Sequence, residues 1–212
     1  MPPINVLLVD DHEVVRGGFR RLFESREDIC VIAEADSGEE AYRLYLEHHP
    51  DVVVMDISMP GSGGLDACRR ILLREADARI LVFSVHENEV FLNRALDLGV
   101  LGYISKRSAS RVMVEAVRKV AAGELYIGQE MLPFLVKRKA SADSRLVGEL
   151  SPREFEVFRL RAEGLSVNDI AALLNVSPKT VGHHNTSLKQ KLGAANDAEL
   201  TRLAIRLGVI SP

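Results

Sequence analysis

The sequence predicts an α/β fold, a doubly wound five-stranded parallel sheet, followed by an all-α domain of four helices. Five short runs rich in Val and Ile recur through the first 106 residues, and amphipathic stretches separate them. Strands that are apolar on both faces and alternate with helices are typical of a parallel sheet covered by helices. After Leu150 the strand-like runs cease and helix-start signals follow one another instead.

The strands follow in chain order as INVLLV (4–9), ICVIAEA (29–35), DVVVMD (51–56), RILVFS (79–84) and LGYIS (101–105). Between them, apolar residues recur at helical spacing, which predicts the intervening helices. These residues are Val15, Phe19 and Leu22; Ala41, Leu44 and Tyr45; Ile71 and Leu72; and Val90, Ala95 and Leu98. We expect the strand–helix units to form a first domain over residues 1–123.

Residues 124–147 lose this periodicity and become polar, which predicts a linker that begins with a short helix interrupted by Pro133. The domain over 148–212 has legible helix starts. Ser151, Pro152 and Glu154 predict an N-cap, a first helical residue and a capping-box partner. Similar signals follow at Ser166 with Asp169, Ser177 with Pro178, and Asn196 with Glu199. Four short helices, two of them joined by NVSP, suit a helix-turn-helix module.

Composition narrows the class of protein. The chain has 212 residues, 47% of them hydrophobic and 27% charged, which is an ordinary globular composition. Cys30 and Cys68 lie in apolar or helical patterns, and no apolar run approaches the length of a membrane span. We therefore expect a soluble, cytoplasmic protein that does not bind membranes. The net charge is −3, yet the stretch from Ser177 to Gly193 contains three lysines and no acid, which indicates a local contact with a polyanion.

Reactive side chains stand at the carboxyl ends of four predicted strands: Asp10 and Asp11, Asp56, Ser84 and Lys106. In a doubly wound sheet these ends meet at one crevice. Three carboxylates would repel each other there, and a hard cation such as Mg²⁺ would relieve the repulsion. Each residue alone is more simply a loop cap or a solvated end, but five at matching positions favour a site.

The chemistry of such a site is phosphoryl transfer. Asp56 is a carboxylate nucleophile able to form an acyl phosphate. The metal and Lys106 would neutralise charge on the phosphoryl group, and the hydroxyl of Ser84 could donate to its oxygens.

The motifs VDDH, MDISMPGSGG, FSVH and GYISK, followed by SPREFEVFRLRAEGLSVNDIAALLNVSPKTV, resemble those of a known family. Residues 4–122 resemble the receiver domain of two-component response regulators, and residues 148–210 resemble the DNA-binding domain of the NarL/FixJ (LuxR-type) class. A weaker likeness, in SVH, SKR and NDAEL, is to regulators of sugar-phosphate uptake.

The resemblance implies a sensor histidine kinase that phosphorylates Asp56, and a bound Mg²⁺. It implies as metal ligands Asp11, Asp56 and the backbone carbonyl of Ser58, with Asp10 acting partly through water. Ser84 and Tyr103 match the family's two switch residues.

Two residues depart from the family pattern. Arg107 stands where many receivers have proline after the lysine, so the peptide bond between Lys106 and Arg107 can be cis or trans. Val85 is bulkier than the residue that usually follows the switch hydroxyl, which would narrow access to the phosphoryl group.

The third helix of the second domain, Pro178–Leu192, is predicted to read promoter DNA. Val181, Leu188 and Leu192 should pack on Ile170, Leu173 and Leu174. The opposite side would carry the DNA-binding residues Lys179, Thr180, Gly182, His183, Thr186 and Lys189. Gly182 is unusual inside a helix. Either the backbone comes close to DNA there, or a base contact has been lost.

The sequence therefore predicts a transcription factor that is switched by phosphorylation, is not an enzyme, and forms a homodimer when phosphorylated. Candidate dimer residues are Val112 and Val117, and Leu203 and Leu207 in the last helix. The alternatives are an atypical regulator that ignores phosphate, a phosphorelay carrier, and a hydrolase with an aspartyl-phosphate intermediate. Such hydrolases usually carry a second Asp where this chain has Ser58.

Overall fold

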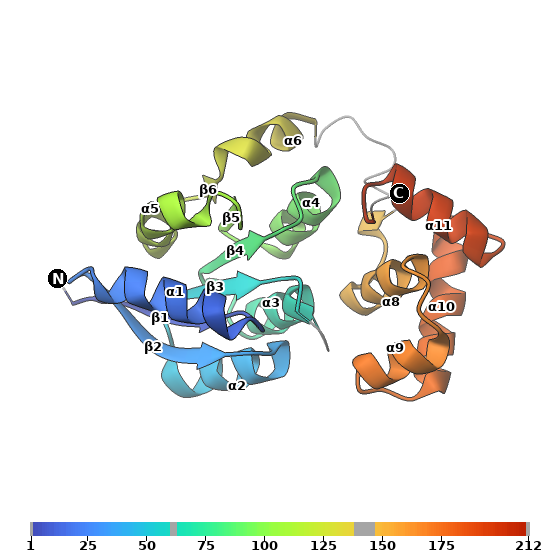
Figure 1. The fold of residues 1–212 in the computed structure, drawn as a ribbon, viewed down its shortest axis with the longest axis horizontal. Coiled ribbons are helices and arrows are strands. Elements are labelled where there is room, and N and C mark those ends of the chain that lie inside the picture. Colours follow the sequence, from blue (N-terminus) through green and yellow to red (C-terminus); the bar gives the residue numbers. More distant parts are fainter. Residues whose placement is uncertain (1, 60–62, 138–146, 211–212) are drawn as a thin grey trace. The chain divides into compact units, whose positions relative to one another are not determined.

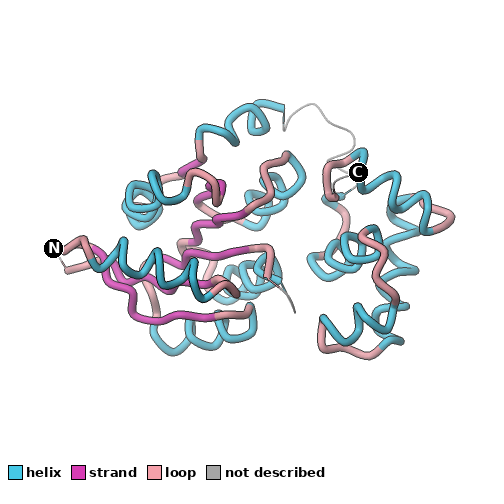
Figure 2. The backbone as a smooth tube through the Cα atoms, viewed as in Figure 1, coloured by secondary structure: helices cyan, strands magenta, loops and turns pink. Residues whose placement is uncertain are grey.

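The structure is a computed structural model that describes residues 2–59, 63–137 and 147–210. The chain separates into two compact units, residues 1–87 with 95–133 and residues 88–94 with 134–212. All strands of the described residues belong to the first unit, and the described part of the second is helical (Figures 1 and 2).

A parallel sheet of six strands in the order β2-β1-β3-β4-β5-β6 forms the centre of the first unit. Its strands are β1 (Ile4–Val9), β2 (Ile29–Ala35), β3 (Val52–Asp56), β4 (Ile80–Ser84), β5 (Gly102–Ser105) and β6 (Tyr126–Ile127). The helices between them are α1 (Glu13–Glu24), α2 (Gly38–His48), α3 (Gly63–Arg74), α4 (Glu89–Leu98) and α5 (Ala109–Ala121). The predicted alternation of strands and helices is confirmed.

The predicted number of five strands is wrong, because β6 adds a sixth strand inside the segment expected to be a linker. Tyr126 pairs with Gly102 and Ile127 with Tyr103. The backbone N–H of Gly128 then donates to the carbonyl of Tyr103 at 2.9 Å. A strand of two residues shows no periodicity in a sequence, which is why the pattern gave no sign of it.

Helices α1 and α5 cover one face of the sheet. Side chains at alternating strand positions, such as Val6 and Leu8 of β1, pack there with Phe23 of α1 and Met113 and Val117 of α5. Val117 is fully buried, so the prediction that it lies in a dimer surface is wrong.

The chain leaves the sheet through a 3₁₀ turn, η1 (Gln129–Met131), and helix α6 (Leu132–Lys137). Pro133 lies in the first turn of α6, where its missing N–H breaks no helical hydrogen bond. The prediction that Pro133 interrupts this helix is therefore wrong. Residues 138–146, the polar part of the predicted linker, lie outside the described residues.

The second unit contains α8 (Pro152–Ala162), α9 (Val167–Leu173), α10 (Pro178–Leu192) and α11 (Asp197–Arg206). The predicted caps are confirmed. Ser151 and Ser166 form complete capping boxes, and the side chains of Ser177 and Asn196 accept from the backbone N–H three residues on.

Helix α10 is held by a small apolar core. Val181, Leu188 and Leu192 are buried as predicted, and so are Ile170 and Leu174. Leu173 is 38% exposed, so its predicted place in this core is wrong. Helix α9 ends at Leu173, and Leu174, one turn after Ile170, takes the inward position.

Candidate functional site

Two carboxylates and one ammonium form the centre of the first candidate site. Asp56 is the last residue of β3, and Asp10 directly follows β1, the neighbouring strand. Both side chains are fully buried. Nζ of Lys106, just after β5, lies 2.6 Å from Oδ2 of Asp10 and 2.7 Å from Oδ2 of Asp56. The structure thus brings these three predicted residues together.

The charges of this cluster are not balanced, because one ammonium serves two buried carboxylates. Burial, the largest influence, raises the pKa of Asp56, and the hydrogen bond from Lys106 opposes it only in part. Burial also lowers the pKa of Lys106, but its hydrogen bonds to Asp10 and Asp56 outweigh this and raise that pKa. The lysine is therefore a fixed positive charge at neutral pH.

Asp11 and His12 complete an acidic cluster beside this pair. Single ligand atoms of Asp10, Asp11, His12 and Asp56 all lie within 4.8 Å of one another. Oδ1 of Asp11 is buried and accepts no hydrogen bond from the described residues, although Nδ1 of His12 lies 2.9 Å away. A buried carboxylate oxygen without a donor is a suitable ligand for a hard cation.

Ser58 and Ser84 border the Asp56 carboxylate. The backbone N–H of Ser58 donates to Oδ1 of Asp56 at 2.9 Å, and the two serine hydroxyl oxygens lie 3.5 Å apart. Oγ of Ser84 accepts from the backbone N–H of His86 at 3.1 Å. The described geometry therefore places the predicted serines beside the carboxylate of Asp56.

Tyr103 lies behind this edge of the sheet. Its side chain is fully buried, and its hydroxyl donates to the carbonyl of His86 at 2.7 Å. Burial, the largest influence, raises the pKa of the phenol, so the hydroxyl remains a donor. The hydroxyl thus holds the loop that follows Ser84, the last residue of β4.

Gly64 supports the strand end that bears Asp56. A Cβ at this position would lie 2.0 Å from the backbone carbonyl oxygen of Asp56. Only glycine permits this close approach of α3 to β3. Of the motif MDISMPGSGG, Met59 is buried, whereas Pro60 lies outside the described residues. The described residues contain no cis peptide bond, so the bond between Lys106 and Arg107 is trans.

Helix α10 presents a polar face that forms the second candidate site. Four of the six residues predicted on it are exposed: Lys179, Thr180, His183 and Thr186. Gly182 is half-buried, and a Cβ added there would meet no atom within 4 Å. Because the protein leaves this space free, packing does not explain the glycine.

Lys189, the sixth predicted residue, already has a partner. Its ammonium lies 2.8 Å from Oδ1 of Asp197, which also pairs with Arg161. The hydrogen bond from Lys189 is the largest influence that lowers the pKa of Asp197. This acid on α11, which the sequence analysis missed, neutralises part of the positive charge of α10. The sequence of α10 alone does not indicate this ion pair, because Lys189 and Asp197 lie on different helices.

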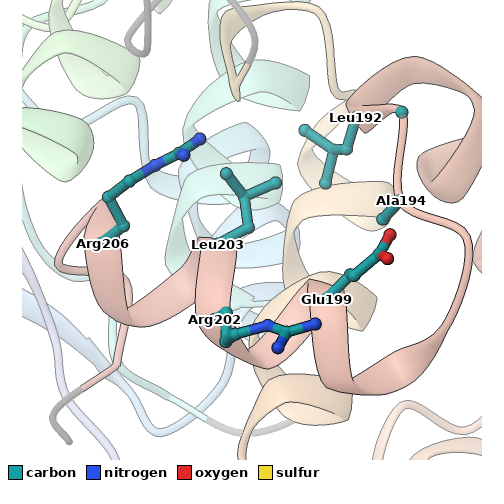
Figure 3. A pocket seen from close by; sticks show the side chains of 7 residues that line it. Leu192, Ala194, Glu199, Arg202, Leu203 and Arg206 are labelled. Atoms are coloured by element: carbon teal, nitrogen blue, oxygen red, sulfur yellow. The ribbon is translucent and has the colours of Figure 1, made fainter.

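A hollow of about 380 Å³ lies at the carboxyl end of α10. Figure 3 shows Leu203 extending from α11 toward Leu192, with Arg202 and Arg206 along the same side of α11. Leu203 and Leu207, predicted as dimer residues, are 9% and 8% exposed. The more accessible part of this surface is formed by Arg202 and Arg206, which we call the arginine edge of α11.

Comparison with known proteins identifies the family of each domain. Residues 6–118 match the family model of the response regulator receiver domain, and residues 148–204 match that of bacterial regulatory proteins of the luxR family. The chain is a LuxR-type response regulator. Among its relatives is Response regulator UvrY of Escherichia coli K12, 39% identical over 97% of this chain and 95% of the relative.

Two further relatives support the assignment. Response regulator GacA of Pseudomonas aeruginosa is 36% identical over 98% of both chains. A structure of RcsB from Salmonella enterica serovar Typhimurium, bound to promoter P1flhDC in the presence of phosphomimetic BeF3−, is 31% identical, with a TM-score of 0.68. The match covers 94% of this chain and 97% of the RcsB chain.

The family membership decides against the hydrolase that the sequence left as an alternative. The protein is a DNA-binding transcriptional regulator and not a hydrolase, since its relatives are regulators over nearly their whole length. None of the helices in the described ranges is long and apolar enough to cross a membrane. The narrower likeness to regulators of sugar-phosphate uptake stays a prediction.

Proposed function

We propose that this response regulator accepts a phosphoryl group on Asp56 from a sensor histidine kinase. The observation that carries the proposal is the ammonium of Lys106, held between the buried carboxylates of Asp10 and Asp56. A carboxylate oxygen of Asp56 would attack phosphorus as the bond to the kinase histidine breaks and its electron pair returns to the imidazole. The product is an acyl phosphate.

The neighbouring side chains have distinct roles in this proposal. Lys106 would neutralise charge on the phosphoryl oxygens, and the hydroxyl of Ser84 would donate to one of them. The Oγ of Ser84 already accepts from the N–H of His86, whose carbonyl binds the hydroxyl of Tyr103. Movement of Ser84 would therefore reach Tyr103 through one residue.

The donor set fits Mg²⁺, which would be held by Asp10, Asp11, Asp56 and the backbone carbonyl of Ser58. The buried Oδ1 of Asp11 without a hydrogen bond supports this choice, as do the three carboxylates that the cluster contains beside His12. When bound, the ion supplies positive charge to the oxygens of the incoming phosphoryl group.

We further propose that the phosphorylated protein binds promoter DNA through α10, as the family and the promoter-bound RcsB structure suggest. The contacts would come from Lys179, Thr180, Gly182, His183, Thr186 and Lys189. A homodimer of the phosphorylated form would suit paired half-sites about one helical turn apart. Its surface would include the arginine edge of α11 (Figure 3).

The proposed division of labour follows the predicted domains, a receiver over 1–123 and a DNA-binding domain over 148–212, except that the first part of the predicted linker, 124–147, adds strand β6 to the sheet of the receiver. The two family matches lie inside the outer ranges. Because a DNA-binding regulator must reach promoter DNA, we propose that the protein works in the cytoplasm.

Incubation with acetyl phosphate and Mg²⁺ tests the phosphoacceptor. The intact mass should rise by one phosphate, and EDTA should prevent the change. Asp56→Asn should abolish it, whereas Asp77→Asn, at an exposed aspartate, should leave it intact. Stoichiometric phosphorylation of Asp56→Asn would show that another residue is the acceptor.

A further inference from the structure

The loop that carries Lys106 is held by Glu130, which lies after residues 6–118, the range that matches the receiver family. Ser105 and Ser108 flank Lys106 at the junction of β5 and α5, and both are buried. The backbone N–H of Ser105 donates to Oε1 of Glu130 at 3.2 Å, and the hydroxyl of Ser108 donates to the same oxygen. One carboxylate thus fixes both ends of this loop.

Glu130 continues the sheet with its side chain. Strand β6 pairs with β5 only as far as Tyr103, so the N–H of Ser105 has no partner strand. The carboxylate of Glu130 occupies that place because η1 folds back after Gly128. A Cβ at Gly128 would lie 3.0 Å from Oε1 of Glu130, so the glycine leaves room for the return.

A second carboxylate holds the same loop from the opposite neighbour in the sheet. The hydroxyl of Ser105 donates to Glu87, which follows β4, and Arg107 donates to Glu87 at 3.3 Å. The backbone N–H of Lys106 donates to the carbonyl of Ser84 at 2.8 Å. These three hydrogen bonds come from β4 or from the segment just after it, whereas Glu130 holds the loop from the side of β6.

We propose that Glu130 is a positioning residue for phosphoryl transfer, which holds the Ser105–Ser108 loop so that Lys106 meets the phosphoryl group. The inference rests on the proposed function of Asp56. Lys106 acts by placing charge at a defined point, and a misplacement of about 1 Å can cost up to about 100-fold in rate.

The position of Glu130 in the chain also links the Lys106 loop to the segment that leads out of the receiver. It lies in η1, directly before α6 and the segment that leads to the DNA-binding domain. A shift of the loop on engagement of a phosphoryl group by Lys106 would be passed through Glu130 to the start of that segment. By linkage, phosphorylation of Asp56 and the position of η1 would then influence each other.

The rate of phosphorylation by acetyl phosphate tests the inference in the full chain. Glu130→Ala should lower the rate constant at saturating donor about tenfold, with little change in the half-saturating concentration. Glu130→Gln retains an acceptor oxygen and should recover part of the rate. Glu115→Ala, at an exposed glutamate on α5, is the matched control and should react like the wild type.

Two readouts separate positioning from a merely structural role. In Ser108→Ala, adding Glu130→Ala should slow the reaction by much less than it does in the wild type, because both changes release one loop. The amide proton of Ser105 should move upfield in Glu130→Gln, since its acceptor loses the charge. If Glu130→Ala does not fold, Glu130→Gln and Ser108→Ala carry the test.

The outcomes distinguish the two proposals. Failure of the wild type to accept phosphate would overturn the proposed function itself. A phosphorylated wild type with Glu130→Ala or Glu130→Gln reacting at the same rate, or with strictly additive effects of Ser108→Ala and Glu130→Ala, would overturn the role of Glu130 alone.

Discussion

Removing the ammonium from the acidic site should destabilise the protein and make its stability depend on a divalent cation. In Lys106→Met the buried carboxylates of Asp10 and Asp56 lose the charge that lies 2.6 and 2.7 Å away. Breaking a buried ion pair by deleting one partner costs about 3–5 kcal/mol. At roughly 4 °C per kcal/mol, the midpoint of the receiver transition should fall by roughly 12–20 °C in EDTA.

Magnesium should reverse part of this loss. The variant presents a more negative site, so it should bind the ion more tightly and gain more stability from it than the wild type does. A site filled at 100 times its dissociation constant contributes about 2.7 kcal/mol. Because burial raises the pKa of Asp56, this carboxyl takes up a proton as the pH falls, so the deficit should be largest near pH 7 and shrink toward about pH 5.

Scanning calorimetry of the full chain measures both effects, with the receiver transition recognised by its response to Mg²⁺. Lys119→Met, which removes a half-exposed lysine of α5 from a pair with Glu115 at 3.8 Å, serves as control. That pair is worth less than about 1 kcal/mol. The reasoning is refuted if Lys106→Met in EDTA unfolds within a few degrees of this control, or if magnesium stabilises both variants equally.

Three predictions concern the DNA-binding domain. Burial raises the pKa of Glu154, but hydrogen bonds, the largest from Lys191, lower it to about 2. Since this lies below the unfolded value of about 4.3, Glu154→Gln should cost about 3 kcal/mol at neutral pH and almost nothing near pH 2, as acid titration of unfolding would show. Gly182→Ala should stabilise α10 by about 0.5–1 kcal/mol in urea unfolding, and a loss of DNA affinity in that variant would indicate close DNA approach. Lys179→Ala should lower the salt slope of DNA binding by about one, and Lys189→Ala by less, because Asp197 already neutralises Lys189; equal slopes would contradict this.

Sequence reasoning succeeded where a physical rule acts locally. Strands such as Val52–Asp56 are buried on both faces, so their composition alone indicates a parallel sheet. Once the sheet is parallel, its geometry brings Asp10, Asp56 and Lys106 to one edge. The caps at Ser151 and Ser166 were equally legible, because each depends on residues three positions apart.

It failed where the partner is distant and the pattern short. Strand β6 is too short to have a period, and Glu130 meets Ser105 across 25 residues of chain. The pairs of Asp197 with Lys189 and of Glu154 with Lys191 join different helices, so no local spacing indicates them. The helical period predicts an inward Leu173, but the helix ends at that residue.

The two-residue strand β6 bears on how this protein should be cut for study. A receiver fragment ended at residue 118, where the family match stops, would lack Tyr126 and Ile127 and leave the outer edge of β5 unpaired, although β5 would still pair with β4. An open strand edge is a template for pairing with another chain, so such a fragment would tend to self-associate for reasons unrelated to phosphate. It would also have lost Glu130. A fragment carried through Pro133, the end of the compact unit, keeps both.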